Sequence, residues 1–345
     1  MEFERYRQEL MDTAAALLAV DSPTGFTHHA IRFIQERAQA LGYETRQTNK
    51  GGLVVSVPGR EHTRKVGIAA HVDTLGLMCR AITEKGELMF TKIGAPLLQT
   101  LDGEYCRIHT RTGAVYTGTV LSLSPSIHVF DDAATRPRDE QNMYVRLDMP
   151  VYSRQDVLEL GIEVGDFICI DPKTTVTDSG YLKSRFIDDK GPAAALLTLL
   201  KAMGDTGFVP RYDTQLHFSI YEEVGHGGSE IDPELSELLV VDMGCIGGDL
   251  RCTEQMVSIG LKDSSGPYDY EMTTRLMTLA RENGIPYAAD VYPHYGSDAE
   301  AAWHAGGHMR AALIGPGVHA SHGMERTHWD GLKAMLQLVT LYLSK

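Results

Sequence analysis

The sequence has few cysteines, no long apolar run and no excess of basic residues. Its five cysteines are widely spaced and include no Cys-x-x-Cys pair, which argues against a disulfide framework or a zinc ribbon. The first residues are charged and lack a signal-peptide pattern, and no apolar stretch approaches the length of a membrane span. We therefore expect a cytoplasmic protein with reduced thiols and no membrane partner.

The charge balance also limits the partners. The formal net charge is -14, from 46 acidic and 32 basic residues. Nucleic acids and anionic membranes are bound through basic surfaces, so neither is expected here. With 345 residues, 43% of them hydrophobic, the chain can form a full core and exceeds the usual size of one domain. We expect one large domain with an insert, or two domains.

The two outer parts of the chain show an α/β pattern. Short apolar runs alternate with helical periodicity, and such runs are typical of strands that are buried on both faces of a sheet. Polar residues follow directly after these runs, so the pattern predicts an α/β sandwich with its site at the strand ends. The main predicted elements are helices over 4–20, 28–41, 192–203, 268–283 and 329–344 and strands over 65–70, 215–220, 238–241, 287–291 and 311–314.

The middle of the chain, from 76 to 173, has a different character. Helical periodicity is absent, and short β-like segments are separated by glycines, which predicts a small all-β domain. We therefore predict a discontinuous catalytic domain over 1–75 and 174–345 with an inserted β domain. Within the insert, the polar loop 131–141 is a candidate for disorder or for contact with another subunit.

Residues able to bind metal follow successive elements of the α/β part. Each motif alone is weak: the Asp188-Asp189 pair, for example, could equally be an acidic helix start. Their joint occurrence at strand ends is a strong signal for two imidazoles and several carboxylates around zinc, cobalt or manganese. The candidates are His71, Asp73, Asp188, Asp189, Glu222, Glu223, Asp242, His319, His322 and His328.

This set of residues suits amide hydrolysis. Five ligands with one shared carboxylate would hold two metal ions about 3.5–4 Å apart. A remaining carboxylate outside the ligand set could take a proton from water and pass it to the leaving nitrogen. His217, which lies inside a predicted strand, is interpreted instead as a hydrogen-bonded residue of the core or of the surroundings of the site.

Four motifs resemble those of the tetrahedral, or glutamyl and deblocking, dinuclear metallo-aminopeptidases. The similarity covers nearly the whole chain, including the β insert, and it implies a zinc-exopeptidase-like three-layer α/β sandwich with a mixed central sheet and an inserted barrel-like domain. The motifs are Ala69-Ala70-His71-Val72-Asp73-Thr74-Leu75-Gly76, Phe186-Ile187-Asp188-Asp189-Lys190-Gly191, Tyr221-Glu222-Glu223-Val224-Gly225 and Val241-Asp242-Met243-Gly244.

The resemblance implies a metal ligand set. Asp188 matches the carboxylate that bridges two divalent ions, which are expected to be Zn²⁺, with Co²⁺ or Mn²⁺ as alternatives. His71 and Asp242 match the further ligands of one ion. Glu223 and His322 match those of the other.

The resemblance also implies the roles of the remaining acids. Glu222 matches the general base, and Asp73 matches the carboxylate behind the ligand His71 that orients its imidazole. Asp189 is implied to be structural, because members of this family have an unusual peptide bond between the paired acids.

The chain departs from the family pattern at two places. Lys190 stands where the family usually has Arg. The final motif, from Val318 to His328, differs from the common His-Ser-Pro-x-Glu form. His322 aligns best with the ligand, and His319 is the alternative. This form resembles a bacterial subgroup whose members often accompany genes for a dipeptide-type osmolyte, which indicates a narrow substrate.

The resemblance implies an exopeptidase that removes the N-terminal residue of small peptides. It also implies a homo-oligomer, from a dimer up to a tetrahedral dodecamer, in which the β insert forms the dimer contacts and influences access to the site. The alternative is an amidohydrolase or deacylase that acts on a small N-acylated or amidated dipeptide. A third hypothesis is an inactive binding protein on the same fold, against which the intact ligand set argues.

Overall fold

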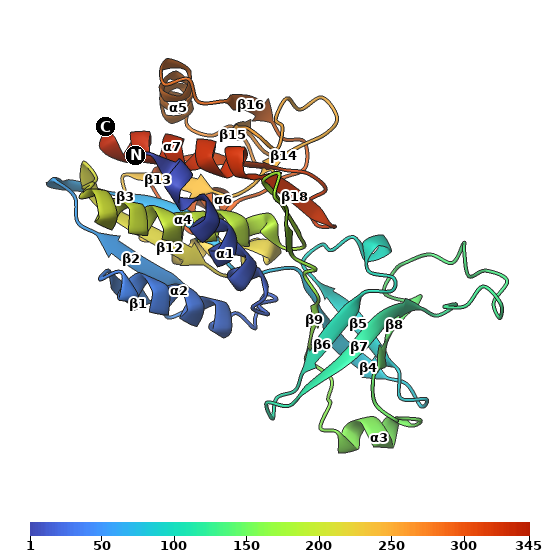
Figure 1. The fold of residues 1–345 in the computed structure, drawn as a ribbon. Coiled ribbons are helices and arrows are strands. Elements are labelled where there is room, and N and C mark those ends of the chain that lie inside the picture. The colour runs from blue at the N-terminus through green and yellow to red at the C-terminus, as the bar shows by residue number, and fades with distance from the viewer. The chain divides into compact units, whose positions relative to one another are not determined.

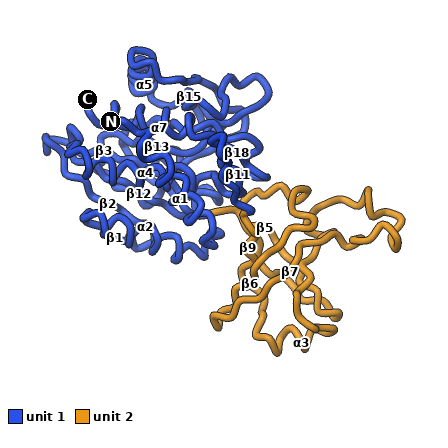
Figure 2. Tube along the Cα trace, viewed as in Figure 1, with its two compact units in different colours: residues 1–73, 173–345 blue, residues 74–172 orange.

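The computed structural model describes all residues from 1 to 345 and divides into two compact units. Unit 1 comprises Met1–Asp73 and Lys173–Lys345, and unit 2 comprises Thr74–Pro172 (Figures 1 and 2). Every residue implied to bind metal or to act in catalysis lies in unit 1. No helix in the structure is long and apolar enough to cross a membrane.

Unit 1 is organised around a mixed sheet with the strand order β1-β2-β12-β3-β13-β17-β15-β16, to which β14 adds beside β17. The four central strands β12, β3, β13 and β17 are parallel. β1 and β2 pair antiparallel with their neighbours, and β15 is antiparallel to β17 but parallel to β16. The predicted mixed α/β fold is confirmed. The strands are β1 (Glu44–Gln47), β2 (Leu53–Val57), β3 (Glu61–His71), β12 (Tyr212–Ser219), β13 (Glu237–Val241), β14 (Gly244–Cys245), β15 (Val257–Lys262), β16 (Tyr287–Val291) and β17 (Arg310–Val318).

Helices cover both faces of this sheet, because alternate residues of the buried strands point to opposite sides. In β13, Leu239 and Val241 belong to one hydrophobic cluster, whereas Leu238 and Val240 belong to another. The first cluster contains side chains of α1 (Arg7–Leu18), α2 (His28–Ala40), α4 (Ile187–Thr206), α5 (Tyr270–Glu282) and α7 (Trp329–Ser344). The second contains side chains of α6 (Asp298–His304). The result is three layers (Figure 1).

Short elements complete unit 1. Three of them are the single-turn helices η1 (Phe3–Tyr6), η3 (Glu222–Val224) and η4 (Gly227–Glu230). The strands β10 (Thr175–Val176), β11 (Tyr181–Ser184) and β18 (Glu325–His328) form a small antiparallel sheet in which Ser184 pairs with Glu325. This pairing places the end of the β17–β18 connection beside the start of α4.

Unit 2 is a closed antiparallel barrel, as the sequence predicted. A helix that the sequence did not predict, α3 (Arg154–Glu159), starts at a capping box formed by Ser153 and Asp156, and η2 (Leu98–Thr100) lies after β5. The strands in barrel order are β4 (Gly76–Ile82), β5 (Leu88–Ile93), β8 (Met143–Leu147), β7 (Val115–Ser122), β6 (Tyr105–His109) and β9 (Phe167–Ile170).

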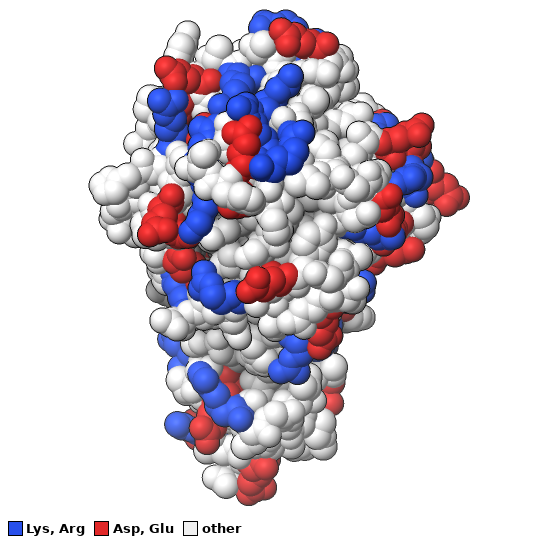
Figure 3. Space-filling view, turned by 90° about the vertical axis from the view of Figure 1, so that its left-hand side faces the viewer, with Lys and Arg blue, Asp and Glu red and all other residues white.

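Charged side chains of both signs lie on the face shown in Figure 3. Several Lys and Arg side chains gather in its upper part, with a few Asp and Glu side chains among them. Near the amino ends of the central strands, Arg64 lies 3.8 Å from Glu237 and Arg211 lies 3.0 Å from Glu61. These ion pairs offset part of the positive charge at this place.

Candidate metal centre

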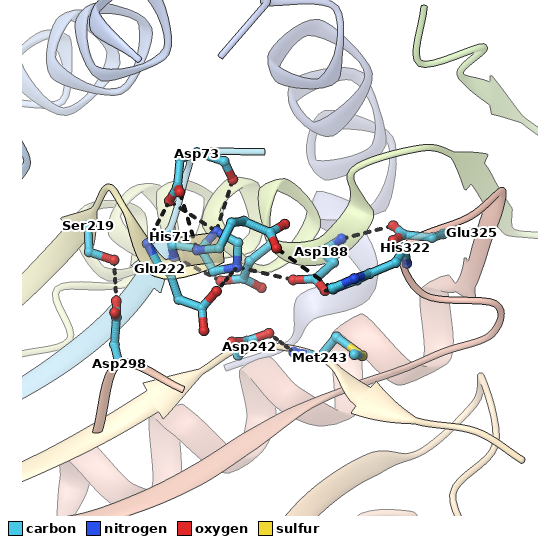
Figure 4. Close-up of polar contacts among 12 residues, drawn as sticks. His71, Asp73, Asp188, Ser219, Glu222, Asp242, Met243, Asp298, His322 and Glu325 are labelled. Atoms are coloured by element: carbon cyan, nitrogen blue, oxygen red, sulfur yellow. Dashed lines mark hydrogen bonds and ion pairs between the residues drawn. The ribbon is translucent and has the colours of Figure 1, made fainter. Parts of the chain in front are cut away.

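Five segments of unit 1 bring the predicted residues together (Figure 4). His71 is the last residue of β3, and Asp242 follows β13 directly. Glu222 and Glu223 form η3 after β12, and Asp188 lies in the first turn of α4. The carboxyl ends of parallel strands meet at one edge of a sheet, which explains how positions far apart in the sequence converge. His322 joins them from the connection between β17 and β18.

Asp188 lies between the two imidazoles. Its Oδ1 is 3.1 Å from His71 Nε2, and its Oδ2 is 3.6 Å from His322 Nε2. His322 Nε2 is also 3.7 Å from Glu223 Oε2. The side chains of His71 and Asp188 are almost completely buried, whereas that of His322 is 33% exposed. One carboxylate therefore faces both a buried and an accessible imidazole.

Two groups of three potential ligands overlap at this place. The first comprises His71, Asp188 and Glu223, and the second comprises His71, Asp189 and Asp242, with donor atoms within 4.8 Å of one another in each group. Asp189 was implied to be structural, and its Oδ2 accepts the backbone N–H of His71 at 3.0 Å. The peptide bond between Asp188 and Asp189 is cis.

Asp73 contacts both the imidazole of His71 and the η3 turn. His71 Nδ1 lies 3.0 Å from the main-chain oxygen of Asp73 and 3.5 Å from its Oδ1. The carboxylate itself accepts the backbone N–H groups of Glu222 and Glu223 at 3.2 and 3.3 Å, and the hydroxyl of Thr24 at 2.6 Å. Asp73 therefore fixes the position of η3. The sequence did not predict this role of Asp73.

Glu222 lies beside the ligand groups without belonging to either of them. Its Oε2 is 3.6 Å from His71 Nε2, and its side chain is 15% exposed. It is the more accessible of the paired glutamates, since the Glu223 side chain is only 4% exposed. A carboxylate at the edge of the group can reach a substrate and exchange protons with it.

The three histidines of the final motif have different surroundings. His322 alone lies beside Asp188 and Glu223. His319 is exposed and pairs with Arg326 through its backbone. His328 caps α7 by accepting the N–H of Asp330, and its Nε2 lies 2.9 Å from the main-chain oxygen of Ser179.

Two further carboxylates near the site were not assigned a role from the sequence. The side chain of Asp298, at the start of α6, accepts the hydroxyl of Ser219, which is the last residue of β12. Glu325 accepts the backbone N–H groups of Asp188 and His322, both at 3.0 Å. Glu325 lies within the final motif, three residues after His322, whereas Asp298 lies outside the motifs described above. Neither position in the sequence indicated these contacts.

Burial and mutual repulsion dominate the electrostatics of these acids. Burial raises the pKa of both Glu222 and Glu223 well above the usual range. Burial, with the neighbouring charge of Asp188, raises the pKa of Asp242 to about 7. Burial also acts against ionisation of Asp188, but its hydrogen bond with His71 and the nearby imidazole of His322 lower its pKa.

The donor set fits divalent metal ions. Buried carboxylates that repel one another are stabilised by a cation, and the set combines imidazole nitrogens with carboxylate oxygens, as zinc sites do. Glu223 Oε1 and Asp189 Oδ1 are buried and have no hydrogen-bond partner. A buried polar atom without a partner is costly, and an ion would give such an oxygen a partner.

The fold and this donor set indicate a metal-binding α/β enzyme, and sequence comparison defines its family. The profile of the M42 glutamyl aminopeptidase family matches residues 51–338. The "Putative aminopeptidase YhfE" of Bacillus subtilis is 43% identical over 337 residues, covering 97% of each chain. The lysyl aminopeptidase of Pyrococcus furiosus is 26% identical over 224 residues, covering 63% of this chain and 62% of the relative. The chain belongs to the M42 family, as its motifs predicted, and is a metal-dependent hydrolase of peptide bonds.

Solved structures agree with this fold. A TET aminopeptidase from a marine sediment archaeon of the Thaumarchaeota has a TM-score of 0.88 at 18% identity, with 98% of this chain and 97% of that chain covered. An aminopeptidase from Desulfurococcus kamchatkensis has a TM-score of 0.89 at 20% identity, with 99% and 96% covered. At these identities, the similarity demonstrates the three-layer sandwich with its barrel and nothing further.

Proposed function

We propose that this protein is a dinuclear metallo-aminopeptidase that removes the N-terminal residue of small peptides, with Glu222 as the general base. The main support for this proposal is the position of Glu222. Its carboxylate lies 3.6 Å from the imidazole of His71 at the edge of the ligand groups, and Asp73 holds its backbone. A proton-transfer group needs this combination of access and fixed orientation.

The ligands we propose are those that the family resemblance implies. His71 and Asp242 would hold one ion, Glu223 and His322 the other, and Asp188 would contact both, since it lies between the two imidazoles. Zn²⁺ suits this set best, with Co²⁺ or Mn²⁺ as alternatives. When bound, such ions polarise a carbonyl group and lower the pKa of water.

The protein's own residues would supply the proton transfers. Glu222 accepts a proton from the attacking water at its carboxylate and later donates that proton to the nitrogen of the leaving peptide. Asp73 keeps η3 in place during both steps, because its two oxygens accept the N–H groups of Glu222 and Glu223. Its main-chain oxygen faces His71 Nδ1, which fixes the ring orientation and leaves Nε2 toward Asp188.

Assembly into a homo-oligomer is part of the proposal. A related fold, the TET1 peptidase of Pyrococcus horikoshii, can assemble into a tetrahedron or a large octahedral shell. Unit 2 exposes several apolar side chains, among them Tyr152 at 82% and Ile127 at 76%. Exposed apolar residues on this scale favour contact with another subunit, so we assign unit 2 to oligomerisation and access to the site.

The test is a comparison of free and N-acetylated short peptides with the wild type, Glu222→Gln and Asp188→Ala. We expect the wild type to cleave only peptides with a free amine. Glu222→Gln should reduce kcat by about 10²-fold or more, the usual contribution of a general base, and should retain its metal. Asp188→Ala should lose both metals together.

Three results would contradict the proposal. Hydrolysis by Glu222→Gln at the wild-type rate would exclude the general-base role. Equal turnover of N-acetylated peptides would favour the deacylase alternative. Full retention of both metals by Asp188→Ala would exclude a shared ligand at this position.

A further inference from the structure

Glu325 connects two distant segments of the chain that carry proposed ligands. It is the first residue of β18 and is 2% exposed. Its Oε2 accepts the backbone N–H of Asp188, and its Oε1 accepts the backbone N–H of His322, each at 3.0 Å (Figure 4). One buried carboxylate thus spans the start of α4 and the β17–β18 connection, with a separate oxygen for each.

The backbone conformation at His322 is unusual for a loop, so the contact with Glu325 is important for maintaining it. His322 and Ala320 both have positive φ angles, of 63° and 60°, which non-glycine residues adopt infrequently and at a cost. The Nε2 atom of the His322 ring lies 3.6 Å from Asp188 Oδ2. Rotation of the connection would therefore change the distance between the two proposed ligands, which metal coordination tolerates only within a few tenths of an ångström.

We propose that Glu325 is a positioning residue for the metal centre and that it needs both carboxylate oxygens for this role. It touches neither substrate nor metal in this proposal. It acts through the backbone of Asp188 and His322, and holds the two ligands at the separation that binds the ions. The inference rests on the proposed ligand set but not on the identity of the substrate.

A matched carboxylate elsewhere in unit 1 separates positioning from general stabilisation. Asp290 in β16 is 5% exposed, and its two oxygens accept the backbone N–H groups of Arg251 and Cys252 at 3.0 and 3.1 Å. Like Glu325, it is a buried carboxylate that accepts two backbone N–H groups, but both belong to adjacent residues of one segment without proposed ligands. Substitution of either residue should lower the stability of the protein. Only substitution of Glu325 should also lower its metal affinity.

The experiment compares Glu325→Gln, Glu325→Asp and Asp290→Asn with the wild type. Glutamine keeps the size of the side chain but replaces one acceptor oxygen with an amide donor, so one of the two backbone N–H groups loses its acceptor. Aspartate keeps two acceptors on a side chain that is shorter by one methylene. For each protein, Co²⁺ affinity is measured by calorimetry, the visible spectrum of the Co²⁺-loaded form is recorded, and the thermal midpoint is measured without metal.

We expect Glu325→Gln to bind Co²⁺ at least about tenfold more weakly, the usual effect of losing a partner of a metal ligand, and to change the Co²⁺ spectrum. The Co²⁺ affinity of Glu325→Asp should lie between those of the wild type and Glu325→Gln. This variant replaces Glu325→Gln in the comparison if the glutamine variant does not fold. Asp290→Asn should lower the thermal midpoint and leave Co²⁺ affinity and spectrum unchanged.

Either of two results would overturn the inference: wild-type affinity in both Glu325 variants, or equal losses of affinity in Glu325→Gln and Asp290→Asn. A wild type that binds Co²⁺ but does not release N-terminal residues would contradict the proposed function and leave this comparison valid. A wild type that binds no divalent ion would contradict both proposals.

Discussion

At the scale of single residues, the contacts of the site carboxylates differ in ways that the sequence does not display. Asp73 and Glu325 both accept two backbone N–H groups, and these groups belong to residues proposed to bind metal or transfer protons. Such acids act through the backbone and not through their charge alone. A catalytic or ligand motif can therefore contain residues whose function is geometric.

Single residues also differ in how well the sequence predicted their place in the site. Motif spacing was sufficient to propose His71, Asp188 and Asp242, because each follows a recognisable strand or precedes a recognisable helix. It favoured His322 as the ligand and left His319 as the alternative. That choice depends on positive φ angles and on the turn between β17 and β18, which local composition does not specify, and the structure places His322 beside Asp188.

His217 provides a prediction for the dependence of stability on pH. Its ring is buried in β12, with Nε2 3.0 Å from Gln215 Oε1, and burial lowers its pKa to about 4. In the unfolded chain, the imidazole takes up a proton below about pH 6.5. Between these values only the unfolded state is protonated at this position, so stability falls as the pH decreases.

We expect the metal-free wild type to lose about 2–3 kcal/mol relative to His217→Gln between pH 7 and pH 4, since each pH unit contributes about 1.4 kcal/mol. Glutamine keeps a polar group of similar length and does not titrate. Urea unfolding of both proteins at several pH values measures the difference. Parallel curves of unfolding free energy against pH would show that His217 titrates normally in the folded protein.

At the scale of elements, the site depends on how closely β13 and β17 approach one another. Gly315 lies in β17 beside the residue that follows β13, and a Cβ atom at Gly315 would lie 1.9 Å from the main-chain oxygen of Asp242. The N–H of Asp242 donates to the oxygen of Ile314 at 2.9 Å. The glycine thus permits the backbone contact that fixes a proposed metal ligand.

Gly315→Ala should therefore destabilise the protein and displace Asp242. The clash involves backbone atoms that cannot rotate away, so we expect a loss of about 2 kcal/mol or more, at the level of core overpacking, together with weaker metal binding. Gly204→Ala is the control, since it lies inside α4 with nothing within 4 Å of its Cβ position. That variant should gain about 0.5–1 kcal/mol from helix propensity. A Gly315→Ala protein as stable as the wild type would contradict the close approach.

Sequence patterns predicted the elements better than their boundaries. The apolar runs identified the central strands because burial on both faces leaves a continuous signal. The start of α4 was less clear. We placed it at 192, whereas the structure begins α4 at Ile187 and contains non-helical Asp188 and Asp189 within it. The local conformation there comes from contacts such as that of Glu325 with Asp188, which are remote in sequence.

At the scale of the whole molecule, the open question raised by the sequence concerned the polar loop of unit 2. In the structure, the connection between β7 and β8, residues 123–142, extends from the barrel (Figure 1). It is organised internally: Asp132 accepts the hydroxyl of Ser124 at 2.7 Å, and Arg136 Nε donates to Asp132 at 2.9 Å. We call residues 123–142 the β7–β8 arm. Two strongly exposed apolar residues, Ile127 and Val129, lie between Ser124 and Asp132, which are joined by one of these bonds.

We expect the β7–β8 arm to form a contact between subunits of the proposed homo-oligomer. Ile127 and Val129 are 76% and 73% exposed, and burial of such side chains contributes about 1.5–3 kcal/mol each. Replacing both with glutamate should remove this contribution and place charges in the contact. The dissociation constant should therefore rise by about a hundredfold or more.

Light scattering after size-exclusion chromatography measures the outcome, with Val209→Glu as the control. Val209 is 45% exposed and lies in unit 1, between α4 and β12, so a new charge there should leave the assembly intact. The Ile127→Glu, Val129→Glu double variant should elute with a smaller mass at concentrations where the wild type is assembled. Because both residues lie in unit 2, the smaller species should retain its metal affinity. An unchanged mass would exclude the arm as the main contact, and equal dissociation of Val209→Glu would indicate that added charge alone is responsible.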